Sequence, residues 1–124
     1  MDIILDENDM RKAEDMVLIN AINRYCSPSE FKKVITHLAV KNGYGDSYVN
    51  FYFWDSLDEY DKTLYDTPFK GVEVDYLDDV RQYDLRDLFY YVSLAAKRYM
   101  VFSPYEKYCV NKIINKMKNN FNCK

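Results

Sequence analysis

DLRDLFYYVSLAAKRYMVF, residues 84–102, carries the strongest amphipathic pattern in the chain, and the predicted fold is built around it. Its apolar side chains recur every three or four residues, which places them along one face of an α-helix. Asp84 stands directly before the pattern, where its carboxylate can cap the free N–H groups of the first turn. We therefore expect a central core helix. Its predicted buried stripe is Leu85, Leu88, Phe89, Val92, Ala95, Ala96 and Tyr99.

Three further helices are predicted around the central one. The first covers about residues 10–25, with Met10, Ala13, Val17 and Ala21 on one stripe. The motifs SPSE (27–30) and SPYE (103–106) each place serine as N-cap, proline at the first helical position and glutamate at the third. Both motifs therefore predict capped helix starts. The helix that follows SPSE would bury Phe31, Val34, Ile35 and Leu38 and end near Gly43. The helix that follows SPYE would continue through Tyr108, Val110, Ile113, Ile114 and Met117.

Between these helices the period changes from helical to alternating. YVNFYFW (48–54) is rich in aromatic, β-favouring residues, and GVEVDYL (71–77) alternates apolar with acidic side chains. The two segments are expected to pair as antiparallel strands. The inward residues would be Val49, Phe51 and Phe53 on one strand and Val72, Val74 and Tyr76 on the other, with Glu73 and Asp75 facing outward.

The segment WDSLDEYDKTLYD (54–66) joins the two predicted strands and holds five acids. Ser56 and Glu59 have capping-box spacing, which predicts a short helix over residues 57–65. Its inward residues would be Leu57, Tyr60 and Leu64, with Asp58, Glu59, Asp61 and Lys62 in water. The patterns together predict an α+β, mostly helical fold with about four main α-helices, one short helix and a small antiparallel sheet of two to three strands. A chain of 124 residues favours a single domain, 1–124.

Charge is unevenly distributed although the whole chain carries only −3. Residues 55–87 hold 11 acids and 4 bases, whereas residues 97–124 hold 7 bases and 1 acid. The acidic middle favours a basic partner. The odd cysteine count (Cys26, Cys109 and Cys123) without CxxC spacing indicates a reduced, cytoplasmic setting. No signal peptide or membrane span is expected, because no apolar run approaches the roughly 18 residues that a span needs.

Several kinds of chemistry are disfavoured by the sequence. His37 is a lone histidine without a nucleophile motif, and 3 glycines leave little material for a phosphate-binding loop. An EF-hand alignment of residues 55–66 fails, because Tyr60 falls where the loop needs glycine and Asp66 where it needs glutamate. We therefore predict no catalytic residue, metal site or cofactor. The pI near 5.1 also argues against direct nucleic-acid binding through the C-terminal lysines.

The carboxylates and tyrosines of the middle segment are instead interpreted as a protein-binding surface. Carboxylates speed encounter with a basic partner, while aromatic side chains anchor it. The predicted contacts are Asp55, Asp58, Glu59, Asp61, Tyr65, Asp66, Glu73, Asp75, Asp78 and Asp79. Further candidate anchors are Trp54, which is equally a candidate for the core, and Tyr60 and Tyr76.

Three segments together resemble a family of small bacterial immunity proteins. They are FYFWDSLDEYDKTLYD (51–66), PFKGVEVDYLDD (68–79) and LFYYVSLAAKRY (88–99), so the likeness covers about residues 48–100. Members accompany ribonuclease toxins of contact-dependent growth inhibition systems. The resemblance implies a non-catalytic cytoplasmic protein that binds its cognate toxin's nuclease domain, as a 1:1 heterodimer without membrane contact, and neutralises it. Such proteins vary in sequence and fold, so the contact residues above rest on charge and aromatic pattern alone.

Two other functions remain open at the level of sequence. One is a helical adaptor or regulatory module without a toxin, in which the acids only keep the protein in solution. The other is a small hydrolase that uses paired carboxylates, such as Glu73 and Asp75 with Asp78 or Asp79. A pH-dependent rate that disappears with one carboxylate substitution would identify the hydrolase.

Overall fold

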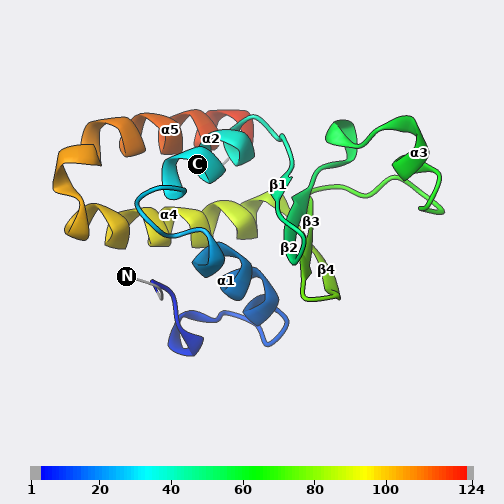
Figure 1. Cartoon of the computed structure of the whole chain (residues 1–124), viewed down its shortest axis with the longest axis horizontal. Helices are drawn as coiled ribbons and strands as arrows, with labels where there is room; N and C mark the ends of the chain where they lie inside the picture. Colours follow the sequence, from blue (N-terminus) through cyan, green and yellow to red (C-terminus); the bar gives the residue numbers. More distant parts are fainter. Residues whose placement is uncertain (1–3, 123–124) are drawn as a thin grey trace.

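The computed structural model describes residues 4–122 and has the predicted α+β, mostly helical architecture (Figure 1). In chain order its elements are η1 (Glu7–Asp9), α1 (Asp15–Arg24), α2 (Phe31–Ala39), β1 (Tyr44–Gly45), β2 (Val49–Tyr52), η2 (Trp54–Ser56), α3 (Glu59–Lys62), β3 (Val72–Tyr76), β4 (Asp79–Tyr83), α4 (Leu85–Phe102), η3 (Pro104–Glu106) and α5 (Lys107–Asn120). Within residues 4–122, none of the helices combines the length and the apolar character that crossing a membrane requires.

The sheet is an antiparallel meander in the order β1-β2-β3-β4, so it has four strands where two to three were predicted. The predicted pairing of β2 with β3 is confirmed, with Phe51 opposite Val74. β4 was missed because four of its five residues are exposed and give no inward alternation. The turn into it consists of Leu77 and Asp78, both with positive φ, in place of the glycine or asparagine that usually marks such a tight turn.

The four longer helices, α1, α2, α4 and α5, gather on one side of the sheet (Figure 1). α1 packs against β3 and β4, α4 packs against α1 and α5, and α2 packs against α5. The prediction of α4 as the central helix is confirmed. Its buried stripe differs at three positions, because Tyr91 is buried whereas Leu85 and Phe89, which were predicted to be buried, are half-buried. The residues of α4 in the core are Leu88, Tyr91, Val92, Ala95, Ala96 and Tyr99.

Buried tyrosines tie these layers together through their hydroxyl groups. Each donates a hydrogen bond to an oxygen elsewhere in the chain: Tyr25 to the Val49 carbonyl at 2.6 Å, Tyr83 to the Glu14 carbonyl at 2.5 Å, Tyr91 to the Asp15 carboxylate at 2.6 Å and Tyr99 to the Glu106 carboxylate at 2.6 Å. A phenol suits these positions because its apolar ring is buried while its polar tip finds a partner. Burial raises the pKa values of Tyr25, Tyr83 and Tyr99 to about 12.

Several predicted helix boundaries are wrong. α1 begins at Asp15 rather than near Met10, and Ala13 is exposed. The Ser27 hydroxyl does not cap α2 and lies instead 3.2 Å from the Ser29 hydroxyl, while the Ser27 carbonyl oxygen accepts the N–H groups of Glu30 and Phe31 in a turn. α2 ends at Ala39, well before Gly43.

The SPYE motif likewise forms the separate 3-10 turn η3 before α5 starts at Lys107. Tyr108, predicted to continue the apolar stripe of this helix, is 76% exposed. The rest of the predicted stripe is confirmed, because Val110 and Met117 are buried and Ile113 and Ile114 are half-buried beside them.

Candidate partner-binding surface

The connection between β2 and β3, residues 53–71, includes α3 and lies on the side of the sheet away from α1, α2, α4 and α5 (Figure 1). An aromatic cluster holds it in place. The ring of Trp54 meets those of Tyr65 and Phe69 edge-on, with centroids 5.7 and 5.6 Å apart, and the Tyr65 and Phe69 centroids are 5.2 Å apart. These contacts give a long loop a fixed position. Trp54 is therefore half-buried and structural as well as accessible.

The short helix of this connection is capped differently from the prediction. Asp58, not Ser56, is its N-cap and accepts the N–H of Asp61 at 2.7 Å. The Ser56 hydroxyl instead donates to the Phe53 carbonyl at 2.8 Å and closes η2. Consequently α3 has only four residues, Glu59–Lys62.

The predicted inward face of the short helix is wrong. Tyr60 and Leu64 are 71% and 67% exposed, and Leu57 is half-buried. A helix of one turn cannot bury a stripe, and the aromatic cluster already anchors the connection. Tyr60 is therefore available to a partner, together with the exposed carboxylates Asp55, Asp58, Glu59 and Asp66 and the half-exposed Asp61.

A groove of about 480 Å³ opens between α2, β1, β2 and this connection. Asp58 and Asp61 line one part of it, and His37, Tyr44 and Tyr52 line others. Burial raises the pKa of the Tyr52 phenol, and the carboxylates of Asp75, Glu73 and Asp61 add to the effect in that order. The Tyr52 phenol therefore stays protonated, and the carboxylates of Asp58 and Asp61 give the groove the acceptor oxygens that suit the side chain of a lysine or arginine.

His37 is exposed on this groove, and its ring lies edge-on to that of Tyr44 with the centroids 5.1 Å apart. Its contribution to the groove could not be read from the sequence. The residues that share the groove with it lie 5 or more positions away, and no spacing rule links them.

Glu73 is buried, so the prediction that it faces solvent is wrong. Its carboxylate accepts the Tyr65 hydroxyl at 2.5 Å and the Gln82 amide at 3.1 Å, and the residue is 8% exposed. Burial raises the pKa of Tyr65, and the hydrogen bond to Glu73 raises it further, so the phenol remains a donor at neutral pH. The Tyr65–Glu73 pair thus fastens the connection to the sheet.

The remaining predicted acids lie in a second region. Because Tyr52 pairs with Glu73 and Val49 pairs with Tyr76, the turn after β3 lies at the opposite end of that strand from the connection. The length of β3 separates the two ends by about 13 Å. Asp79 is bonded to Arg81 at 2.9 Å, and the Asp75 carboxylate accepts the N–H of Asp78 at 2.9 Å. Tyr76 is half-buried against the core.

An exposed apolar corner between α4 and α5 was missed by the sequence reasoning. Val101, Phe102, Tyr105 and Tyr108 are 77%, 65%, 83% and 76% exposed. This corner lies at the opposite end of the molecule from α3 (Figure 1). The available signal was that Val101 and Phe102 continue the helix beyond Tyr99 without joining the predicted stripe. Exposed apolar clusters often mark contact surfaces.

In the part of the chain that the structure describes, no group of three or more His, Cys, Asp and Glu side chains has an arrangement that could hold a metal ion. Burial raises the pKa of the Cys26 thiol to about 12, and Cys109 is exposed and unpaired. Cys123 lies outside the described residues.

Comparison with known protein families gives a match over most of the chain. The model of a family described as CDI immunity protein matches residues 15–114, which run from the start of α1 into α5 and include the whole connection. No curated protein sequence matches the chain.

Proposed function

The chain belongs to the CDI immunity protein family, and we propose that it binds the nuclease domain of a cognate ribonuclease toxin in the cytoplasm and neutralises it. The observation that carries the choice of surface is the acidic groove beside α3, where Asp58 and Asp61 lie next to exposed Tyr60. A ribonuclease must present cations to hold the phosphates of RNA. Carboxylates placed against those cations steer the encounter and occupy the positions of the phosphates.

The proposed roles of the predicted residues differ according to their position. Asp55, Asp58, Glu59, Asp61 and Asp66 are contacts for the basic surface of the toxin, and Tyr60 is the anchor. Tyr65, Glu73 and Trp54 are positioning residues, because they hold the connection in place. Asp75, Asp78, Asp79 and Tyr76 form a separate surface at the other end of β3. We propose a single domain, a 1:1 complex and inhibition without catalysis.

The test uses the toxin domain that the tagged protein captures from its native bacterial lysate and that cleaves RNA when isolated. Association rates are measured by surface plasmon resonance at low and at physiological salt. The double variant Asp58→Asn and Asp61→Asn removes two charges but keeps an N-cap, since asparagine also caps helices. If each lost pair is worth about 0.2–1 kcal/mol, the two together weaken binding by roughly 2- to 30-fold.

The matched control is Asp78→Asn with Asp79→Asn, which makes the same charge change at the other end of β3. We expect slower association and lower salt dependence only for the α3 variant. Equal rates for wild type and the α3 variant would refute the groove as the interface. Loss of binding only in Phe102→Ser with Tyr105→Ser would move the interface to the apolar corner. Failure to capture any RNA-cleaving partner would count against the nuclease assignment.

A further inference from the structure

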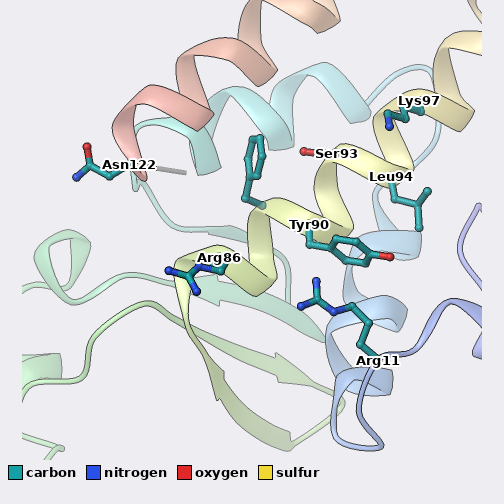
Figure 2. A pocket seen from close by; sticks show the side chains of 8 residues that line it. Arg11, Arg86, Tyr90, Ser93, Leu94, Lys97 and Asn122 are labelled. Atoms are coloured by element: carbon teal, nitrogen blue, oxygen red, sulfur yellow. The ribbon is translucent and has the colours of Figure 1, made fainter. Parts of the chain in front are cut away.

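A basic pocket lies on α4, away from the acidic groove residues (Figure 2). Its volume is about 600 Å³, and Arg11, Arg86 and Lys97 contribute three cations to its wall. None of its described lining residues is a carboxylate. In a chain of net charge −3 this is a local reversal of sign, which favours an anionic occupant.

Two of the three cations of the basic pocket, Arg86 and Lys97, lie along one stripe of α4. Arg86, Tyr90, Ser93 and Lys97 follow at intervals of four, three and four residues, so they share one face of α4. Arg86 and Lys97 therefore attach to the backbone about 16 Å apart along the helix axis. Figure 2 shows them at opposite ends of the stripe with Tyr90 between them. An elongated occupant with negative charge at both ends fits this spacing better than a single small anion.

Arg86 and Lys97 are free to bind an anion. Six other described cations form ion pairs with carboxylates, as Lys12 does with Asp87 at 3.2 Å, whereas neither Arg86 nor Lys97 forms one within residues 4–122. Arg11 has its guanidinium 4.2 Å from the centre of the Tyr90 ring, which holds it beside the middle of the stripe. The Ser93 hydroxyl also has no hydrogen-bond partner among these residues, but its oxygen is buried, so the two exposed cations carry the argument.

We propose that the basic pocket binds an extended acidic segment of the partner toxin, an inference that rests on the proposed function. Arginine holds a carboxylate with two parallel hydrogen bonds, and about five extended residues span the distance between Arg86 and Lys97. Half-buried Phe89 and Leu94 in the wall would contact apolar side chains between the acids. Nucleic acid fits less well, because three cations release few counterions and the net-negative chain repels a longer polyanion.

The test measures fluorescence anisotropy with the full chain and a labelled six-residue peptide, which has two glutamates at each end and leucine and phenylalanine in the middle. Arg86→Gln with Lys97→Gln is compared with Lys116→Gln and Lys118→Gln, which remove the same charge from exposed positions of α5. We expect the pocket variant to weaken peptide binding about ten-fold and the α5 variant to leave it unchanged. A glutamine analogue of the peptide should bind as weakly as the glutamate peptide binds the pocket variant.

Equal peptide binding by wild type and the pocket variant would overturn the proposal. So would tighter binding of labelled hexauridylate RNA than of the peptide, if the pocket variant lost it, because the occupant would then be nucleic acid. With the captured toxin domain, the pocket variant should dissociate faster while its association rate still responds to Asp58→Asn and Asp61→Asn. Loss of the peptide effect alone overturns the pocket proposal and leaves the proposed function standing. Failure to capture a toxin while the peptide still binds would overturn the proposed function and, with it, the toxin as the source of the acidic segment.

Discussion

Replacing Tyr65 with phenylalanine should loosen the acidic connection while leaving its aromatic cluster in place. Phenylalanine keeps the ring that packs on Trp54 and Phe69 but removes the hydroxyl that donates to Glu73 at 2.5 Å. One oxygen of the buried Glu73 carboxylate then loses its partner, while the other still accepts from Gln82. A hydrogen bond to a charged group contributes about 1.5–3 kcal/mol, and the half-buried position of Tyr65 favours the lower part of that range.

Urea denaturation followed by two signals measures the size of this effect. With a urea dependence of about 2 kcal/mol per M, a loss of about 1.5–2 kcal/mol lowers the midpoint by roughly 0.7–1 M. Trp54 is the only tryptophan and lies in the connection, so its fluorescence reports the connection, whereas far-UV circular dichroism reports the helices. For Tyr65→Phe, we expect the urea midpoint measured by Trp54 fluorescence to fall at least as far as the midpoint measured by circular dichroism.

The control is Tyr60→Phe, which removes a hydroxyl from a 71% exposed tyrosine of the same connection. Its midpoint should stay within about 0.2 M of wild type, because surface substitutions of this kind change stability little. A Tyr65→Phe midpoint equal to that of the control would refute the assignment of Tyr65 and Glu73 as the fastening of the connection. Glu73→Gln, which keeps an acceptor but removes the charge, should fall between the two.

Two further predictions concern the folded state. The pKa of Asp46 is lowered from 3.8 to about 2, first by its hydrogen bond with Arg24 and then by the N–H groups of Tyr48 and Val49. This carboxylate therefore stabilises the fold above about pH 4 and loses that effect as the pH falls toward 2. Unfolding midpoints measured across this window should fall less steeply for Asp46→Asn than for wild type, and parallel curves would contradict the reasoning. Gly71 has φ +79°, and a Cβ there would lie 2.1 Å from the Tyr83 carbonyl oxygen. In thermal denaturation, Gly71→Ala should therefore lower the free energy of unfolding by more than about 1 kcal/mol. The control Lys70→Ala, at an exposed neighbouring position, should change it little.

The extent to which sequence predicted the fold depended on whether the signal was local. α4 and the inward faces of Val49, Phe51 and Phe53 were predicted because periodicity records which side of an element meets the core. Helix starts were predicted less well. The motifs that begin with Ser27 and Ser103 are compatible both with a side-chain cap and with a separate backbone turn, and the structure has the turn in each case. β4 was invisible because its exposed residues carry no alternation, and only its hydrogen bonds to β3 define it.

The candidate site divides in the same way. Sequence by itself determined that carboxylates concentrate in residues 54–79, and that most of these acids are exposed, because charged side chains rarely lose water without a partner. Only the tertiary structure decided that Glu73 has such partners and is buried, and that the acids divide between the two ends of β3. It alone assembled the basic pocket, where Arg11 approaches α4 from a segment 75 positions before Arg86. Pairing and burial depend on groups that chain folding brings together from distant positions, and the order of residues does not record those distances.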